Sequence, residues 1–256
     1  MKLKNTLATL PLVLNACGSD ESSSGFSPED PAQGLWTGGF SSTPITTTSA
    51  SGAISSTEIS SIEKAGVALY TSDKRVFFYD ISSDILFAND IPGYFGQIIY
   101  YSPNYFVNSV SNDKVAMDGN VYTATSILGA ISSPLSGNYA MVFDDKYFRG
   151  ADLNRLSGGW FYAGPAGNWN ISVLSDGSFT ATLSSISSCV VSGIFSTIDT
   201  RYNEYAIDNI SFESCGGYDG NYSGLAATID TSQQNDTLLM AVFNTDHGFF
   251  MQPVKN

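Results

Sequence analysis

Apolar and polar residues alternate in short runs along most of the chain, and helical periodicity is hard to find. The clearest run is WNISVLSDGSFTATL, residues 169–183, in which every second residue is apolar on both sides of Asp176-Gly177. Asp-Gly favours a two-residue hairpin turn, because glycine tolerates a positive φ angle. We therefore expect a β-hairpin in which Trp169, Ile171 and Val173 lie on one face of the first strand, and Phe179, Ala181 and Leu183 lie on one face of the return strand.

Further strands are expected along the rest of the chain. VAMDGNVYTAT, residues 115–125, has the same form, with Asp118-Gly119 as its turn. Other strand candidates are RVFFYDI, FGQIIYY, CVVSGIFSTI, YAIDNISF, YSGLAATID, TLLMAVF and GFFMQPV. Many short strands at near-regular spacing predict an all-β fold of meandering antiparallel sheets, which form one or two small barrel-like modules.

A weak internal repeat suggests two modules. GLWTGGF (residues 34–40) and GGWFYAG (residues 158–164) each place Trp beside Gly, and each begins a long run of predicted strands. The polar, interrupted segment 143–156 lies between these runs. We place an N-terminal β module at 34–152 and a C-terminal barrel-like module at 153–256, while one larger barrel or a continuous sheet stays open. The Ser/Thr-rich segment 41–61 is expected to be a mobile hairpin or loop.

The first 33 residues follow a different pattern. A short basic start with Lys2 and Lys4 precedes a short apolar run at 7–14, and Ala16-Cys17 follows. This order resembles the lipobox of bacterial lipoproteins, which implies a signal peptide at 1–16 and lipidation, including palmitate, of Cys17. The alternative is a plain secretory signal that is cut after Ala16 and leaves a free cysteine. Residues 18–33 are rich in Ser, Gly, Pro and acids, so 17–33 is expected to be a lipidated flexible tether.

The formal net charge of the chain is −13. Loss of Lys2 and Lys4 with the signal peptide would leave nine basic residues against 24 acidic ones, a net charge of −15. Such a surface repels nucleic acid and anionic lipid headgroups. Membrane attachment is therefore expected to come from the N-terminal lipid.

The chain contains three cysteines, of which Cys189 and Cys215 remain once Cys17 is assigned to the lipid. In an oxidising envelope, an even pair in one predicted module indicates a disulfide. The alternative is a metal pair, but two thiols with His247, the single histidine, would make a poor site. No metal or cofactor is predicted.

Catalytic patterns are weak. His247 lies in a short Thr-Asp-His-Gly link between two predicted strands, and no Gly-x-Ser-x-Gly segment accompanies it. Asp144-Asp145, Glu204 and Glu213 offer carboxylates for glycoside hydrolysis, and the Asp pair with Asp152 could bind calcium, as could Asp219-Gly220-Asn221. None has the spacing of a defined motif, so no catalytic residue is predicted and the protein is expected not to be an enzyme.

Aromatic residues are dense in YFGQIIYYSPNYF (94–106) and GGWFYAGPAGNW (158–169). Neighbouring strand residues point to opposite faces, so Trp160 and Phe161 cannot both belong to a core on one face. Core packing explains part of this density, and an exposed binding surface explains the rest. The residues proposed for a ligand or partner surface are Tyr94, Tyr100, Tyr101, Tyr105, Trp160 and Tyr162.

The order of motifs along the chain is similar to that of poorly characterised lipoproteins of Gram-negative bacteria. These motifs are the lipobox, the Ser-rich tether, Gly-Leu-Trp-Thr-Gly, the SDGSFTAT hairpin, the two cysteines and the closing segment LLMAVFNTDHGFFM. The Gly34-x-Trp36 start also resembles lipocalins, and the β-barrel lobes of transferrin-binding protein B are a more distant likeness. The resemblance implies an outer-membrane lipoprotein, facing the periplasm or the cell surface, and carries over no ligand. The expected exposed aromatics and loops favour a non-enzymatic module that binds an envelope or host protein or a small apolar ligand. A structural or assembly role in the envelope is the alternative, followed by a hydrolase.

Overall fold

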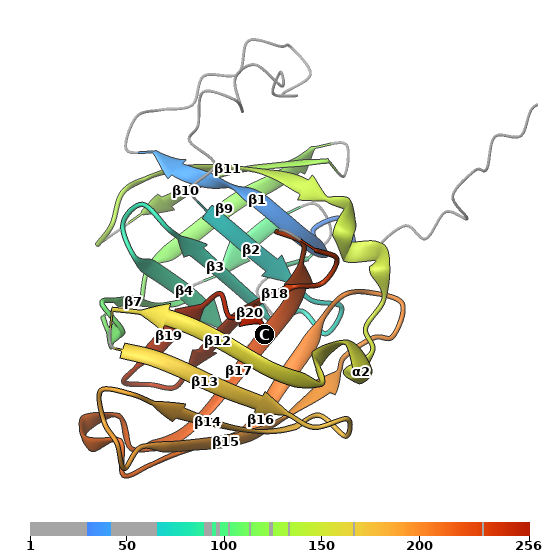
Figure 1. The fold of residues 1–256 in the computed structure, drawn as a ribbon. Coiled ribbons are helices and arrows are strands. Elements are labelled where there is room, and N and C mark those ends of the chain that lie inside the picture. Colours follow the sequence, from blue (N-terminus) through green and yellow to red (C-terminus); the bar gives the residue numbers. More distant parts are fainter. Residues whose placement is uncertain are drawn as a thin grey trace, which may run out of the picture.

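The computed structural model describes residues 30–41, 66–89, 94–95, 98–101, 103–112, 114–122, 125–132, 134–165, 167–231 and 233–256, with the side chains of 41, 94–95 and 98–101 excepted. The described chain forms two antiparallel sheets (Figure 1). One sheet curls into a half-barrel and the other closes into an eight-stranded barrel, which confirms an all-β fold with barrel-like modules. The predicted loop at 41–61 lies outside the described residues, except for Ser41, which ends the first strand.

The half-barrel contains eleven strands in the order β5-β6-β9-β10-β11-β1-β2-β3-β4-β7-β8. Its strands are β1 (Gly34–Ser41), β2 (Gly66–Tyr70), β3 (Val76–Asp80), β4 (Ile85–Asn89), β5 (Tyr94–Phe95), β6 (Ile98–Tyr101), β7 (Asn104–Val107), β8 (Val110–Ser111), β9 (Ala116–Tyr122), β10 (Ser126–Ser132) and β11 (Gly137–Asp144). Neighbouring strands pair antiparallel, and most of them follow each other in sequence as in a meander. Longer connections separate β1 from β11, β4 from β7 and β6 from β9.

The chain passes to the barrel through a connector that contains the short helices η1 (Asp145–Arg149) and α2 (Leu153–Leu156). The barrel strands are β12 (Gly158–Gly164), β13 (Gly167–Val173), β14 (Ser178–Leu183), β15 (Val190–Thr197), β16 (Tyr205–Glu213), β17 (Gly220–Ile229), β18 (Thr237–Phe243) and β20 (Val254–Lys255). The ring closes because β18 pairs with β17 and β20, and β20 pairs with β12. β19 (Gly248–Met251) pairs with β18 outside this ring, and η2 (Gly216–Tyr218) precedes β17.

The hairpin expected at 169–183 is confirmed, but the expected two-residue turn is wrong. Leu174 N donates to the Ser178 carbonyl oxygen at 2.8 Å, so the turn spans the three residues 175–177. β13 and β14 pair with Ile171 opposite Ala181, and the six predicted apolar residues are all buried. Gly177 has φ +87°, which explains the need for glycine at the turn.

The turn expected at Asp118-Gly119 is wrong, because both residues lie within strand β9. Gly119 pairs with Gly129 of β10, and the ring of Tyr139 from β11 lies over both glycines. A Cβ atom at Gly119 would lie 2.4 Å from Tyr139 Oη, and one at Gly129 would lie 2.2 Å from Tyr139 Cζ. Gly119 is therefore required for the close approach of an aromatic ring to the sheet rather than for a turn.

Trp36 and Trp160, which mark the weak repeat, make the same contact in the first strand of each sheet. Trp36 Nε1 donates to the carbonyl oxygen of Ala32 at 3.0 Å, and Trp160 Nε1 donates to that of Leu156 at 2.7 Å. Both indoles are fully buried. The short repeat in the sequence therefore corresponds to a repeated structural anchor.

Three clusters of buried residues form the core. One fills the barrel, and a second lies on the face of the half-barrel that carries Trp36 and Phe78. The third joins the two sheets, because Phe77 and Leu86 on the other face of the half-barrel share a cluster with Leu239 on the outside of the barrel. Strands β2 and β18 are consequently buried at every position, which explains why GVALY and TLLMAVF do not alternate.

The predicted tether is shorter than expected, because its last residues belong to the fold. Ala32 and Gln33 are buried, and Gln33 Nε2 donates to Tyr147 Oη at 2.8 Å. The folded part of the chain therefore includes Asp30–Gln33, and the rest of the predicted tether lies outside the described residues.

Candidate functional site

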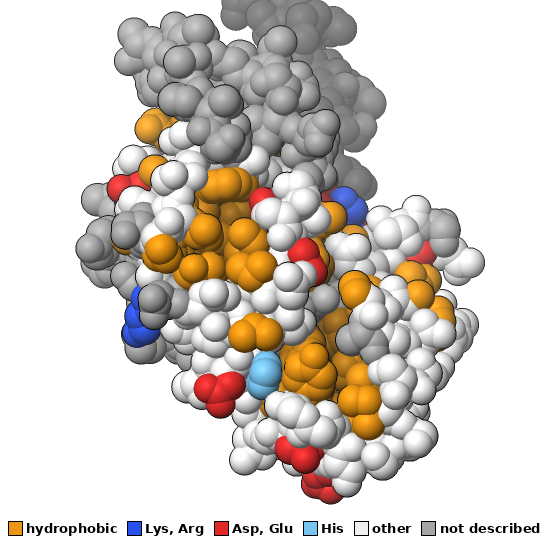
Figure 2. All heavy atoms as spheres, turned by 90° about the vertical axis from the view of Figure 1, so that its left-hand side faces the viewer, with side chains coloured by type: hydrophobic (Ala, Val, Ile, Leu, Met, Phe, Trp, Pro, Cys, Tyr) orange, Lys and Arg blue, Asp and Glu red, His pale blue; other side chains and the backbone are white. Residues whose placement is uncertain are grey.

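A pocket of about 430 Å³ lies where the half-barrel meets the rim of the barrel. Strands β3, β4 and β7 contribute to one side of it, and β12, β13 and β19 contribute to the other. Its lining residues are Tyr79, Ile81, Asp84, Leu86, Phe106, Asn108, Ser109, Tyr162, Gly164, Pro165, Trp169, Tyr218, Gly248, Phe249, Phe250 and Met251. Figure 2 shows this face, with hydrophobic side chains gathered around a hollow beside the pale-blue His247.

Two phenylalanines of β19 connect the pocket to both sheets. Phe250 stacks on Tyr79 of β3, with ring centroids 4.0 Å apart and an interplanar angle of 18°. Phe249 points to the opposite face of β19, and its ring contacts that of Tyr218 edge-on, with the ring centroids 5.4 Å apart. Both modules therefore contribute aromatic side chains to the lining of the pocket.

Asp84 places a carboxylate in the lining of the pocket. Its backbone has φ +52° in the turn between β3 and β4, a conformation that Asp tolerates better than most residues. Tyr79 Oη donates to Asp84 Oδ1 at 2.8 Å. Burial, and then the negative charge of Asp84, raise the pKa of Tyr162. The same two causes, together with the hydrogen bond to Asp84, raise the pKa of Tyr79.

A contact between two hairpins closes the pocket on another side. Asn108 and Ser109 form the turn between β7 and β8, and both have positive φ angles, as a type I′ turn requires. Gly248 N donates to the Ser109 carbonyl oxygen at 3.2 Å, and His247 Nδ1 lies 3.2 Å from the same oxygen. The recorded partner of the imidazole is thus a backbone carbonyl rather than a serine hydroxyl or a carboxylate.

The predicted surface residues separate into three groups. Tyr162 is half-buried and lines the pocket. Trp160 and Tyr105 are buried in the cores of the barrel and the half-barrel, so they cannot form a binding surface. The side chains of Tyr94, Tyr100 and Tyr101 lie outside the described part of the chain.

Most of the pocket was not predicted from the sequence. Tyr79, Phe249 and Phe250 belong to strands that were expected, but nothing local shows that β3 and β19 meet. Asp84 is an ordinary turn residue in sequence. The adjacent aromatics of VFFYD and GFFM were the available signal, because one of two neighbouring rings must leave the core on one face of its sheet.

Cys189 and Cys215 form the predicted disulfide. Both cysteines are buried beside the barrel core. The pair is therefore not a metal site, and the described residues contain no group of three or more His, Cys, Asp or Glu side chains that could hold a metal. Cys17 lies outside the described residues.

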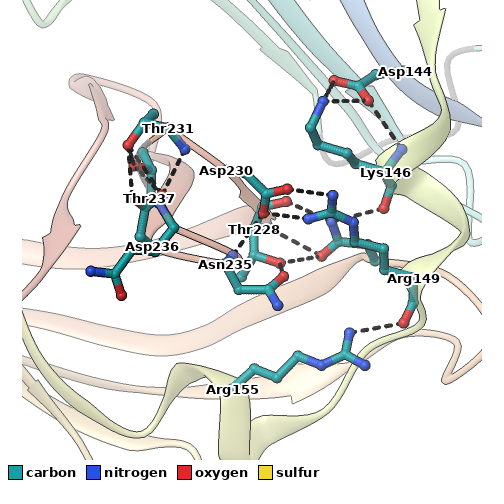
Figure 3. A network of polar contacts seen from close by, with 12 residues as sticks. Asp144, Lys146, Arg149, Arg155, Thr228, Asp230, Thr231, Asn235, Asp236 and Thr237 are labelled. Atoms are coloured by element: carbon teal, nitrogen blue, oxygen red, sulfur yellow. Dashed lines mark hydrogen bonds and ion pairs between the residues drawn. The ribbon is translucent and has the colours of Figure 1, made fainter.

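Two of the acidic residues considered for catalysis or calcium binding, Asp144 and Asp152, cap the short helices of the connector; Figure 3 shows Asp144. Asp144 caps η1 and pairs with Lys146, while Asp152 caps α2 through Asn154 N at 2.9 Å. Arg149 of η1 forms a bidentate ion pair with Asp230, which follows strand β17. Asp144 and Asp152 therefore stabilise the short helices of the connector, and the Arg149–Asp230 pair fixes the connector to the barrel.

Glu204, a second acid considered for catalysis, is fully buried where the two sheets meet. Its carboxylate accepts hydrogen bonds from the Ser72 amide at 3.0 Å, from the Ser72 hydroxyl and from Tyr147 Oη at 2.5 Å. Burial raises its pKa, although these hydrogen bonds oppose the shift. Because the carboxylate is enclosed and well bonded, its role is to join the β2–β3 turn to the connector and the barrel.

Two other clefts are lined mainly by polar residues, although Tyr222 and Phe243 also line one of them. One of about 470 Å³ is lined by amides such as Asn104 and Asn221, and one of about 420 Å³ lies around Gln233 and Lys255. Neither presents the group of aromatic side chains that lines the pocket between the modules. A binding site for an apolar molecule is therefore best supported at that pocket.

A comparison of the chain with protein-family models, with curated proteins and with solved structures finds no match. Among the described helices, none is long and apolar enough to span a membrane.

Proposed function

We propose that the protein is a non-enzymatic binding module that takes a small, largely apolar ligand in the pocket between its two modules. The observation that carries this proposal is the aromatic wall formed by Tyr79, Phe250, Phe249 and Tyr218 around a volume of about 430 Å³. Sites for small molecules commonly have volumes of about 300–1,000 Å³ and pair apolar walls with a few polar groups.

The barrel interior is a less suitable place for a ligand. Trp160, Trp169, Phe179, Phe195 and Phe212 pack together there with smaller apolar residues and fill the closed ring. A small barrel of eight strands has room for side chains or for one small ligand, and here the side chains occupy it.

The experiment uses N-phenyl-1-naphthylamine, a neutral dye whose fluorescence rises when it leaves water. We expect saturable binding, and Tyr162→Ala should weaken it at least fivefold, because this variant removes one wall of the pocket. Phe161→Ala is the matched control, since Phe161 is the next residue of β12 and lies on the exposed face. Equal binding by wild type and both variants would place the dye elsewhere and reject the pocket as the site.

We also propose that the module is exported and held at the outer membrane by a lipid on Cys17. The basic start, the apolar run and Ala16-Cys17 support this assignment, and the disulfide fits an oxidising compartment. Fractionation of the expressing bacterium tests it. Cys17→Ala should move the protein from the membrane to the soluble fraction, and retention of that variant in the membrane would reject the lipid anchor.

A further inference from the structure

Asp84 gives the pocket a negative charge. It is the one acidic residue among those lining the pocket, and no lysine or arginine lines it. Within the described part of the chain, no lysine or arginine forms an ion pair with Asp84. The carboxylate is exposed and its recorded hydrogen-bond donor is the neutral hydroxyl of Tyr79, so its negative charge is not neutralised.

The aromatic side chains next to Asp84 add to this preference. The face of an aromatic ring is negative, and it attracts a cation within about 6 Å of the ring centroid. Tyr79 lies beside the carboxylate because its hydroxyl donates to Asp84, and Tyr162 is close enough for the same charge to raise its pKa. Asp84, Tyr79 and Tyr162 therefore line the same pocket, and Tyr79 is in direct contact with the carboxylate.

We propose that this pocket selects organic cations, with an alkylated ammonium group bound beside Asp84, Tyr79 and Tyr162. The apolar body of the ligand would then lie along Phe249, Phe250 and Trp169. This inference depends on the proposed function and specifies its ligand class. The net charge of −13 acts in the same direction, because it raises the concentration of cations near the protein and disfavours anions.

A pair of probes with the same shape tests the charge preference. Phenyltrimethylammonium carries the cation, and tert-butylbenzene is its neutral carbon analogue. Isothermal titration of the folded chain should give at least tenfold tighter binding of the cation. Asp84→Asn should remove most of that difference in affinity and leave the affinity for tert-butylbenzene unchanged. Added salt should weaken the binding of the cation only.

Asp84→Asn is a conservative change, because Asn also tolerates the positive φ angle at this turn. Asp176→Asn is the matched control, since Asp176 is an exposed acid in the β13–β14 turn and does not line the pocket. Equal affinity for the two probes, or no binding of either, would overturn the cation preference while dye binding sensitive to Tyr162→Ala still supported the pocket. If Tyr162→Ala leaves the affinity for the dye unchanged, the proposed function itself is rejected.

Discussion

Arg149 and Asp230 form a bidentate ion pair that fixes the connector between the two sheets to the end of strand β17. Asp230 Oδ1 also accepts a hydrogen bond from Asn235 N at 2.7 Å, so one carboxylate holds both the connector and the β17–β18 turn. The hydrogen bonds from Arg149 lower the pKa of Asp230.

Arg149→Lys keeps the positive charge but loses the planar fork that matches a carboxylate. We expect a loss of about 1 kcal/mol in the free energy of unfolding, a modest value because both side chains are partly exposed. Urea denaturation at neutral pH measures it. Arg201→Lys is the control, because the Arg201–Asp199 pair lies within one turn and should matter less. A larger effect at Arg201 would contradict the role assigned to Arg149.

Glu204 should make stability fall as the pH rises. Burial raises its pKa in the folded state above the ordinary value of 4.5, so between these two values the folded protein holds a proton that the unfolded chain releases. Stability is therefore lost as the pH rises through this window. Urea midpoints from pH 4.5 to 8 should decline for the wild type and decline less for Glu204→Gln. Asp230 and Asp199 have lowered pKa values, so they change stability only at pH values around and below their ordinary pKa of 3.8, outside the window in which Glu204 titrates. An unchanged slope in Glu204→Gln would show that the carboxyl does not titrate there.

The disulfide should contribute strongly to the barrel. Cys189 and Cys215 are 26 residues apart, and closing such a loop stabilises a fold by about 3–4 kcal/mol in the chain-entropy model. The double variant Cys189→Ala/Cys215→Ala should lose about this amount in chemical denaturation. A thiol assay of the unfolded, unreduced protein should detect neither cysteine. A reactive thiol at either position would contradict the bond.

Gly129→Ala should destabilise the half-barrel by about 1–3 kcal/mol, because its Cβ atom would overlap both the Asp118 carbonyl oxygen and the ring of Tyr139. Gly217→Ala provides the control, since no atom lies within 4 Å of a Cβ atom there. Thermal unfolding of the two variants should separate them clearly. If both lose the same amount, the close approach of Tyr139 is not what requires glycine at position 129.

The fold was predictable where apolar residues alternate and a turn residue marks the reversal. The β13–β14 hairpin satisfies both conditions, so the hairpin and its buried residues followed from the sequence. Its register did not, because a two-residue turn at Asp176-Gly177 would place Val173 opposite Thr180, whereas Val173 lies opposite Phe179. Asp118-Gly119 satisfied them too, but the glycine serves the ring of Tyr139, which is 20 residues away in sequence. Local sequence cannot distinguish a glycine at a turn from a glycine beneath an aromatic ring.

The pocket was predictable only in part, because its walls meet through long-range packing. Tyr162 was identified from a dense aromatic segment. The stacking of Tyr79 on Phe250 joins residues 171 positions apart, and it depends on how the half-barrel docks against the barrel. The same docking buries both faces of β2 and removes the alternation that would have marked that strand.

The third core cluster couples ligand binding in the pocket to the packing of the two modules against each other. Leu86 and Phe106 line the pocket and also belong to the cluster that holds the sheets together. Any molecule that binds only the docked arrangement stabilises it by about 2.7 kcal/mol at a hundred times its dissociation constant. A ligand bound in the pocket would therefore reversibly stabilise the packing of the half-barrel against the barrel.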